Sequence, residues 1–269
     1  MAEKIRIQKY VNGALFTTDD VVATEAPLEI SLTHQGITRP VSVTMRTPGN
    51  DIELAIGFLL TEGLIHRRDD IIGANILAEN AVEVQLSDHK DVPLGALQRH
   101  FYTSSSCGVC GKASLEALEK SATVRSWNHD FPLTLSRADI GRLPERLRAS
   151  QSAFDETGGM HAAAFFAPAN TLPVVREDVG RHNALDKLIG HFFLHDQLPL
   201  NNGVLLLSGR ASFELLQKAA AAGIRAVCAI GAPSSLAVEV ARRFDITLLG
   251  FVKTDRFNIY HQSSHVNWA

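Results

Sequence analysis

Two cysteines in one short segment carry the most chemical potential in this chain. Cys107 and Cys110 lie in segment 102–112, which reads Tyr-Thr-Ser-Ser-Ser-Cys-Gly-Val-Cys-Gly-Lys. This C-x-x-C spacing serves in redox pairs, as half of a metal site, or in presenting a thiolate that carries sulfur. Segment 112–120 has helical spacing of apolar residues, so the cysteines are predicted to lie just before a helix. A helix N-terminus lowers the pKa of a thiol, because its free N–H groups favour the thiolate.

The surroundings of the cysteine pair favour one of these three uses. A zinc site needs two more ligands, and the sequence has no second C-x-x-C. Cys228, the third cysteine, lies in an apolar strand and is predicted to be a buried core thiol. A thioredoxin-like pair would have aromatic and proline neighbours, whereas three serines precede Cys107. Small residues around the pair suit a loop that swings and presents a thiolate, and the zinc and redox interpretations stay open as weaker alternatives.

A second concentration of polar residues lies at a predicted strand-to-helix turn. Segment 176–183 reads Arg-Glu-Asp-Val-Gly-Arg-His-Asn. Turns of this kind at strand ends are where α/β proteins place their sites. We therefore predict ligand contacts from Arg181, His182 and Asn183; the alternative is a solvated loop with a surface ion pair and a helix cap at Asn183. His161 is added because the two glycines before it allow a ligand to approach the backbone closely.

Three glycine turns, each following a predicted apolar strand, complete the candidate site. Backbone N–H groups and an arginine at such a turn can bind an anion. Each turn alone is a weak signal, but three at the carboxyl ends of strands would line one edge of one sheet. That arrangement predicts a pocket for a large phosphorylated or nucleotide-like ligand. The predicted contacts are Ser208, Gly209 and Arg210 in the first turn, Gly231 and Ser234 in the second, and Phe251, Val252, Lys253, Thr254, Asp255 and Arg256 after the last strand.

The elements that must position these residues change in character along the chain. The first part is rich in strands, predicted at 5–10, 28–32, 39–46 and 81–86, with a short strand at 76–77 and a helix at 52–61. The second part alternates helices (136–150, 183–193, 213–222, 235–244) with strands (160–166, 172–177, 204–208, 226–230, 247–252). Continuous apolar strands between helices indicate a sheet covered on both faces. We predict an α/β fold: a three-layer α/β/α sandwich at 129–269 that holds the ligand, and a smaller strand-rich N-terminal domain at 1–128 that carries the C-x-x-C.

Composition narrows the class of protein further. The chain has 269 residues and a net charge of −3, with 45% hydrophobic and 20% charged residues. That charge gives no electrostatic reason to expect nucleic acid or a membrane surface as a partner. No apolar stretch follows the N-terminal charges, no run is long enough to span a bilayer, and three cysteines do not make a disulfide scaffold. We expect a cytoplasmic protein with reduced thiols.

The α/β/α order together with His161 is similar to the zinc nucleobase deaminases. Those enzymes need H-x-E, whose glutamate shuttles protons, and a later P-C-x-x-C for zinc. Here Ala162 and Ala163 follow the histidine and no P-C-x-x-C is present. Deaminase chemistry is therefore disfavoured even if the fold is shared.

Taken together, the motifs resemble the formate dehydrogenase accessory sulfurtransferases, the FdhD proteins. The resemblance covers nearly the whole chain, and the Arg-Glu-Asp-Val-Gly-Arg-His-Asn block is specific. The matching segments are 47–58 (Thr-Pro-Gly-Asn-Asp-Ile-Glu-Leu-Ala-Ile-Gly-Phe), 106–111 (Ser-Cys-Gly-Val-Cys-Gly), 158–161 (Gly-Gly-Met-His), 176–187, 208–214 (Ser-Gly-Arg-Ala-Ser-Phe-Glu) and 231–237 (Gly-Ala-Pro-Ser-Ser-Leu-Ala).

The resemblance implies a specific activity. Proteins like these take sulfur from a cysteine desulfurase as a persulfide and pass it to the molybdenum (or tungsten) bis-guanine-dinucleotide cofactor, before that cofactor enters formate dehydrogenase. They are dimeric, and their deaminase-like domain acts without zinc, so no resident metal is expected. By residue matching, Cys107 would carry the persulfide and Cys110 would be an assisting or resolving thiol. A zinc-binding nucleotide module without catalysis, and a nucleoside deaminase, are the competing hypotheses.

The same resemblance assigns segment 251–256 to the cofactor. Lys253 departs from the pattern, because many relatives are expected to have arginine there. Lysine keeps the charge but loses the bidentate geometry with which arginine binds phosphate.

Overall fold

The computed structural model describes residues 2–88, 132–167 and 172–269. Cys107, Cys110 and the helix expected at 112–120 lie outside the described residues, so the predictions about them stay predictions.

A six-stranded mixed sheet is the centre of the second part of the chain, and its strand order is β13-β12-β11-β10-β8-β9. Strands β10, β11 and β12 run parallel, whereas β8 is antiparallel to both of its neighbours, so β9 points the same way as β10. The predicted strands are confirmed, and β13 extends the sheet on one edge. Their bounds are β8 His161–Phe166, β9 Val174–Asp178, β10 Val204–Leu207, β11 Ala226–Ala229, β12 Thr247–Gly250 and β13 Asn258–His261.

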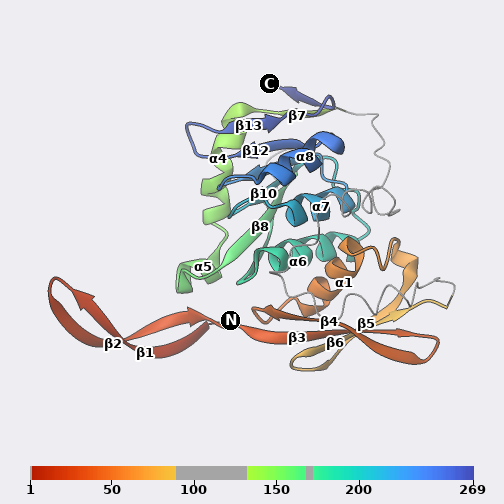
Figure 1. Cartoon of the computed structure of the whole chain (residues 1–269), viewed down its shortest axis with the longest axis horizontal. Coiled ribbons are helices and arrows are strands. Elements are labelled where there is room, and N and C mark those ends of the chain that lie inside the picture. Colours follow the sequence, from red (N-terminus) through yellow and green to blue (C-terminus); the bar gives the residue numbers. More distant parts are fainter. Residues whose placement is uncertain (1, 89–131, 168–171) are drawn as a thin grey trace.

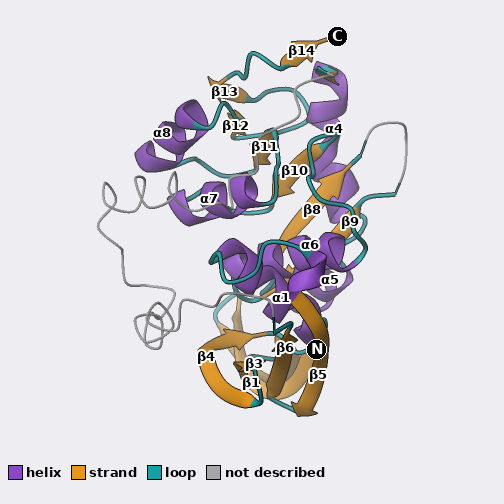
Figure 2. Cartoon of the chain, turned by 90° about the vertical axis from the view of Figure 1, so that its right-hand side faces the viewer, coloured by secondary structure: helices purple, strands orange, loops and turns teal. Residues whose placement is uncertain are grey.

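Both faces of this sheet are covered, as the continuous apolar strands predicted. Along β10, Leu205 and Leu207 belong to the apolar cluster under one set of helices, whereas Val204 and Leu206 belong to a second cluster on the opposite face. The first face carries α6 (Arg181–Leu194), α7 (Phe213–Ala221) and α8 (Ser235–Arg243), and the second carries α4 (Arg137–Arg148). The α/β class is confirmed (Figure 2), whereas a specific likeness to cytidine deaminases stays a prediction.

A smaller four-stranded sheet, ordered β4-β3-β6-β5, forms the base of the molecule (Figure 1). Helix α1 (Asp51–Thr61) packs against β5 and β6 of this sheet. The predicted hairpin is present, although its first strand begins earlier than expected, after a short 3₁₀ turn at Arg68–Asp70. The strands are β3 Ala26–His34, β4 Ile37–Arg46, β5 Ile71–Ala78 and β6 Ala81–Leu86.

Helices α1 and α6 cross at very short range between the two sheets (Figure 2). A Cβ added to Gly57 would lie 1.9 Å from the Asp186 carbonyl oxygen, and one added to Gly190 would lie 1.9 Å from the Glu53 carbonyl oxygen. The two glycines therefore let the helix backbones touch. One continuous apolar cluster runs from Leu28 in the small sheet to Leu248 in the large one. The division into domains 1–128 and 129–269 stays a prediction, and the described residues of its two parts share this core.

The strand predicted at 5–10 is present and longer than expected, but its partner strand and several short elements escaped prediction. Strands β1 (Ala2–Val11) and β2 (Ala14–Ala23) pair as a long hairpin that projects from the body (Figure 1). Its Asn12-Gly13 turn has φ of 50° and 88°, as a type I′ turn requires. Short elements α5 (Ser152–Thr157), β7 (Leu133–Leu135) and β14 (Val266–Trp268) were also missed. Among the described residues, no helix has both the length and the hydropathy needed to cross a membrane.

Candidate functional site

The three glycine turns meet at the carboxyl edge of the large sheet. Because β10, β11 and β12 are parallel neighbours, their following turns emerge side by side. Gly231 N–H donates to Gly209 O at 2.9 Å, and Phe251 N–H donates to Gly231 O at 3.1 Å. Ser234 N–H likewise donates to Ala211 O at 2.9 Å. The predicted alignment of the turns is confirmed; their contact with a ligand stays a prediction.

His161 joins this edge from the neighbouring strand. It begins β8, and because β8 runs antiparallel to β10, the start of β8 lies beside the end of β10. A Cβ added to Gly209 would lie 3.3 Å from His161 Nδ1, and Ser208 Oγ accepts a hydrogen bond from Ala162 N–H at 2.8 Å. Burial and then the charge of Arg181 lower the pKa of His161, against an opposing effect of Asp178.

Segment 251–256 presents an aromatic ring and two cations to solvent. The Phe251 side chain is 43% exposed although its φ is +53°, which is a strained conformation for a bulky residue. Lys253 N–H donates to Arg256 O at 2.8 Å, so one tight turn carries both charged, exposed side chains. Thr254 and Asp255 between them are also exposed. Val252 differs, because its side chain is 1% exposed and packs in the core.

Three further predicted residues in the turns have different surroundings. Arg210 is exposed at the edge. The Ser234 hydroxyl is the N-terminal cap of α8 and accepts a hydrogen bond from Ala237 N–H at 3.2 Å. Gly231 needs its small size, since a Cβ there would lie 3.0 Å from Gly209 O. The residues predicted from the strand-Gly-helix spacing are therefore of two kinds. Arg210 is an exposed cation, whereas Gly231 and Ser234 hold the turns together.

The residues at the start of α6 lie at the same edge, because β9 ends beside β8 and leads into this helix. Arg181 is partly buried, and its Nε makes no hydrogen bond with any described residue. The His182 side chain is 17% exposed, and its Nε2 lies 3.7 Å from Glu214 Oε2. Burial, Lys218 and Arg181 lower the pKa of His182 to about 4, and the nearby Glu214 offsets part of this effect.

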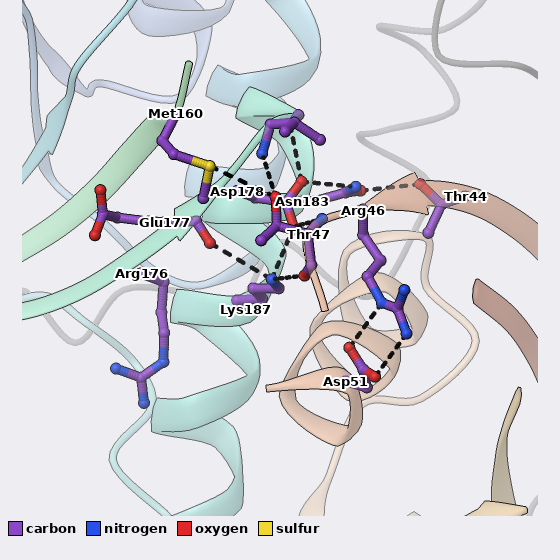
Figure 3. Close-up of polar contacts among 12 residues, drawn as sticks. Thr44, Arg46, Thr47, Asp51, Met160, Arg176, Glu177, Asp178, Asn183 and Lys187 are labelled. Carbon is purple, nitrogen blue, oxygen red and sulfur yellow. Dashed lines mark hydrogen bonds and ion pairs between the residues drawn. The ribbon is translucent and has the colours of Figure 1, made fainter. Parts of the chain in front are cut away.

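Asn183, predicted as a ligand contact, is used inside the protein (Figure 3). Its Nδ2 donates to Met45 O at 2.7 Å and to Asp178 Oδ1 at 3.2 Å, and its Oδ1 accepts from Thr44 Oγ1 at 3.1 Å. These bonds tie the start of α6 to strand β4. The assignment of Asn183 to a ligand remains untested, but its amide already has three partners.

A buried ion pair supports the start of α6 and was missed by sequence reasoning (Figure 3). Lys187 Nζ lies 2.8 Å from Asp178 Oδ2, and also donates to Thr47 O at 2.8 Å. Besides the bond from Asn183, Asp178 accepts bonds from Thr47 N–H at 3.1 Å and Gly180 N–H at 2.8 Å. The signal that could have found this pair is a lysine within an apolar stretch of a predicted helix, where a charge must find a buried partner.

The sequence predicted no resident metal, and it predicted a buried core thiol at Cys228. In the ranges 2–88, 132–167 and 172–269, no group of three or more His, Cys, Asp or Glu side chains could hold a metal ion. Cys228 is 0% exposed in β11, and burial raises the pKa of its thiol. It is the core thiol that its apolar neighbours predicted.

Comparison with known proteins places these observations in a family. The family model described as "FdhD/NarQ family" matches residues 23–267. A curated protein named Sulfur carrier protein FdhD from Mycolicibacterium paratuberculosis is 46% identical over 272 residues, which cover 97% of each chain. A protein of the same name from Streptomyces avermitilis is 44% identical over 271 residues, covering 97% of this chain and 94% of that protein.

One solved structure has the same fold. It is a putative formate dehydrogenase accessory protein from Desulfotalea psychrophila, with a TM-score of 0.76. The alignment covers 98% of this chain and 99% of that chain, at 23% sequence identity. At that identity the likeness concerns the fold alone.

Proposed function

Because the chain belongs to the FdhD/NarQ family, we propose that it is a sulfur carrier that serves formate dehydrogenase. The observation that carries this proposal is the similarity over the whole length to proteins named as sulfur carriers, at 46% and 44% identity. The sequence of each of those proteins aligns with both parts of this chain, so the likeness is not limited to a shared domain.

The sulfur-transfer step is assigned to Cys107. Its thiolate attacks the outer sulfur of a persulfide on a cysteine desulfurase. A new S–S bond forms on Cys107, the S–S bond of the desulfurase breaks, and the desulfurase cysteine leaves as a thiolate. No net oxidation or reduction occurs. Cys110, three residues away, is assigned as an assisting thiol.

The client of the carrier is proposed to be the molybdenum (or tungsten) bis-guanine-dinucleotide cofactor, which is a substrate here and not a resident group. The carboxyl edge of the large sheet supports this choice. Arg210, Lys253 and Arg256 are exposed cations beside the aromatic ring of Phe251. Cations suit the phosphates of a dinucleotide and an exposed aromatic ring suits its purine bases. A cytoplasmic homodimer is part of the same proposal, and light scattering in solution would test the dimer.

Mass spectrometry tests the proposal directly. After incubation with a cysteine desulfurase and cysteine, the intact protein should gain the mass of one sulfur atom, and a reductant should remove it. Cys107→Ala should abolish the gain. Cys228→Ala is the matched control, because this buried thiol should be irrelevant to loading.

Two results would count against a sulfur carrier. One is loading that persists in Cys107→Ala. The other is stoichiometric zinc in the purified protein that is lost in Cys110→Ser, which would favour a zinc-binding nucleotide module instead.

A further inference from the structure

Two histidines lie one turn apart at the carboxyl end of α6, which is the end away from the candidate site. Segment 191–195 reads His-Phe-Phe-Leu-His, and residues four apart lie on the same face of a helix. The centroids of the two imidazole rings are 4.4 Å apart, and the rings are tilted by 43°. His195 is exposed and the His191 side chain is 22% exposed, so solvent reaches both rings.

Hydrogen bonds at Nδ1 decide which nitrogen of each ring can bind a metal ion. His195 Nδ1 lies 2.7 Å from the His191 carbonyl oxygen. A carbonyl oxygen only accepts, so Nδ1 carries the proton and Nε2 of the neutral ring keeps its lone pair. His191 Nδ1 lies 3.0 Å from Glu53 Oε1 and donates to it when it carries the proton. In that tautomer both rings present an Nε2 lone pair.

Glu53 on α1 is placed to orient the His191 ring. Burial raises the pKa of Glu53, but Arg176 and then His191 lower it below its ordinary value, so the carboxylate is ionised and accepts. Metal-binding histidines almost always donate their other N–H to a carboxylate or a backbone carbonyl, and this pair has one of each. Arg176 Nη2, 2.9 Å from His191 Nδ1, favours the opposite tautomer, and an ion at Nε2 must outweigh that contact.

The ligand type selects the class of ion. Imidazole nitrogen suits Zn²⁺, Ni²⁺ and Cu²⁺, whereas Mg²⁺ and Ca²⁺ prefer oxygen. A zinc–nitrogen bond is about 2.0–2.1 Å long, so two rings this close can share one ion. The charges of Glu53 and Arg176 cancel each other, and the carbonyl end of a helix is partly negative. Exposed Asp196 adds a negative charge next to His195.

We propose that His191 and His195 bind a divalent ion of the Zn²⁺, Ni²⁺ or Cu²⁺ class through their Nε2 atoms, while Glu53 orients His191 and water completes the coordination. In the described ranges no three or more side chains of the ligand-forming kinds come together, which agrees with a site of two histidines and water.

A bound ion would also strengthen the crossing of α1 and α6. It selects the Nδ1–H tautomer of His191, and with it the hydrogen bond to Glu53 on the neighbouring helix. Because only the folded chain holds the two rings together in this way, the ion should raise the melting temperature. Sulfur transfer requires none of these residues, so this site goes beyond the proposed function.

The test uses the full-length chain without a polyhistidine tag and with Cys107→Ser and Cys110→Ser, since thiolates also bind these metals. In this parent protein, calorimetric titration should show roughly one Zn²⁺ or Ni²⁺ per chain and no Mg²⁺. Nuclear magnetic resonance of the histidine ring nitrogens should show that Zn²⁺ contacts Nε2 of His191 and His195.

Substitutions in the parent protein separate the ligands from the residue that orients them. Loss of the hydrogen-bond partner of a ligand lowers metal affinity by about 10–100-fold, which is the weakening expected for Glu53→Gln. His191→Gln and His195→Gln should each weaken binding at least as much and abolish the rise in melting temperature. His261→Gln is the matched control, because its side chain is also 22% exposed and pairs with an acid, Asp245, at 3.0 Å. Circular dichroism checks that each variant is folded.

Each result decides for or against the site. Equal Zn²⁺ binding in the parent protein, His191→Gln and His195→Gln would overturn the proposal, as would binding of neither ion. Binding that only His261→Gln removes would also overturn it. Binding that needs both histidines but is unchanged in Glu53→Gln would remove the role given to Glu53. Zinc that remains in Cys110→Ser and is lost in His191→Gln would support the site and leave the sulfur-carrier proposal intact.

Discussion

At the scale of single residues, the charged side chains near the carboxyl edge fall into two groups. Asp178 and Lys187 are fully engaged with each other and with backbone groups. Arg210, Lys253 and Arg256 are exposed and free to meet a ligand. The first group lies within the dense polar motif 176–187, so part of that motif holds the fold together.

Lys187→Met should therefore destabilise the protein strongly. It leaves the Asp178 carboxylate, which is 0% exposed, without its cation, and removes the bond to Thr47 O. Removing one partner of a buried ion pair typically costs about 3–5 kcal/mol of unfolding free energy. Urea denaturation would measure the loss.

The control for this prediction is Arg142→Met. Arg142 pairs with Asp139 at 3.8 Å, and both side chains are more than 60% exposed, at 64% and 66%. A change within about 0.5 kcal/mol is expected there. Equal losses for the two variants would show that the Asp178–Lys187 pair adds nothing beyond a surface contact.

His182 should give part of the acid sensitivity of the fold. Its pKa is about 4 in the folded protein, against 6.5 for an ordinary histidine. Between these values the unfolded chain binds a proton that the folded chain does not, so the free energy of unfolding falls as pH falls from 6.5 to 4. The slope from this one group is at most about 1.4 kcal/mol per pH unit.

Denaturation curves at several pH values in that window would detect this contribution. His182→Gln does not titrate, so its stability should depend less on pH than that of the wild type. His195→Gln, at the exposed end of α6, controls for the loss of a histidine side chain from the same helix. Parallel pH profiles for wild type and His182→Gln would contradict the buried, neutral state of His182.

At the scale of elements, the crossing of α1 and α6 depends on two glycines. Gly190→Ala would place a methyl group 1.9 Å from the Glu53 carbonyl oxygen, with Gly57 N only 2.9 Å away. Backbone atoms of a packed helix cannot move aside cheaply, so the helices must separate. Thermal unfolding should show a loss of at least about 2 kcal/mol, in the range of overpacked cores.

Gly73→Ala is the matched control for that substitution. The nearest atom to an added Cβ there is Gln85 Oε1 at 3.9 Å, which is an ordinary contact. A near-neutral effect is expected in this variant. If Gly190→Ala is equally mild, the two helices do not touch as closely as the structure describes.

Most helices and strands could be predicted from the sequence, because the signals for them lie within short segments. Apolar runs such as 204–207 and 226–229 are buried on both faces, and Ser136 caps α4 through a bond from Asp139 N–H at 3.3 Å. The β2 strand was missed because residues 14–20 are exposed on both faces and carry no burial pattern. The alignment of the glycine turns was predictable from parallel strands, which place their carboxyl ends at one edge.

The partners of buried charges were not predictable in the same way. Asn183 was assigned to a ligand, but it bonds to Met45 O, a residue 138 positions away. Asp186 bonds to Thr61 Oγ1 at 2.9 Å and to Lys218 Nζ at 2.9 Å, across 125 and 32 positions. Contacts over such separations depend on how the elements pack, which no local spacing reveals.

At the scale of the whole molecule, the predicted boundary near 128–132 separates segments that share one core. Arg176 on β9 makes two bonds to Glu53 on α1, at 2.5 Å and 2.7 Å, and Lys218 on α7 lies 3.5 Å from Glu62. These ion pairs surround the α1–α6 crossing. Each joins a residue before the boundary to one after it, so the two sheets are fastened through their helices.

A fragment of residues 129–269 should therefore fail to fold alone. Without α1, the face of α6 that carries Leu185, Leu188 and Ile189, each 0% exposed, would lose part of its apolar cover. Lys187 would also lose its bond to Thr47 O. Calorimetry of the full chain should show one cooperative transition, and circular dichroism of the fragment should show none. A fragment that melts cooperatively, together with two separate transitions in the full chain, would mean that the core in Figure 2 is divided at the predicted boundary after all.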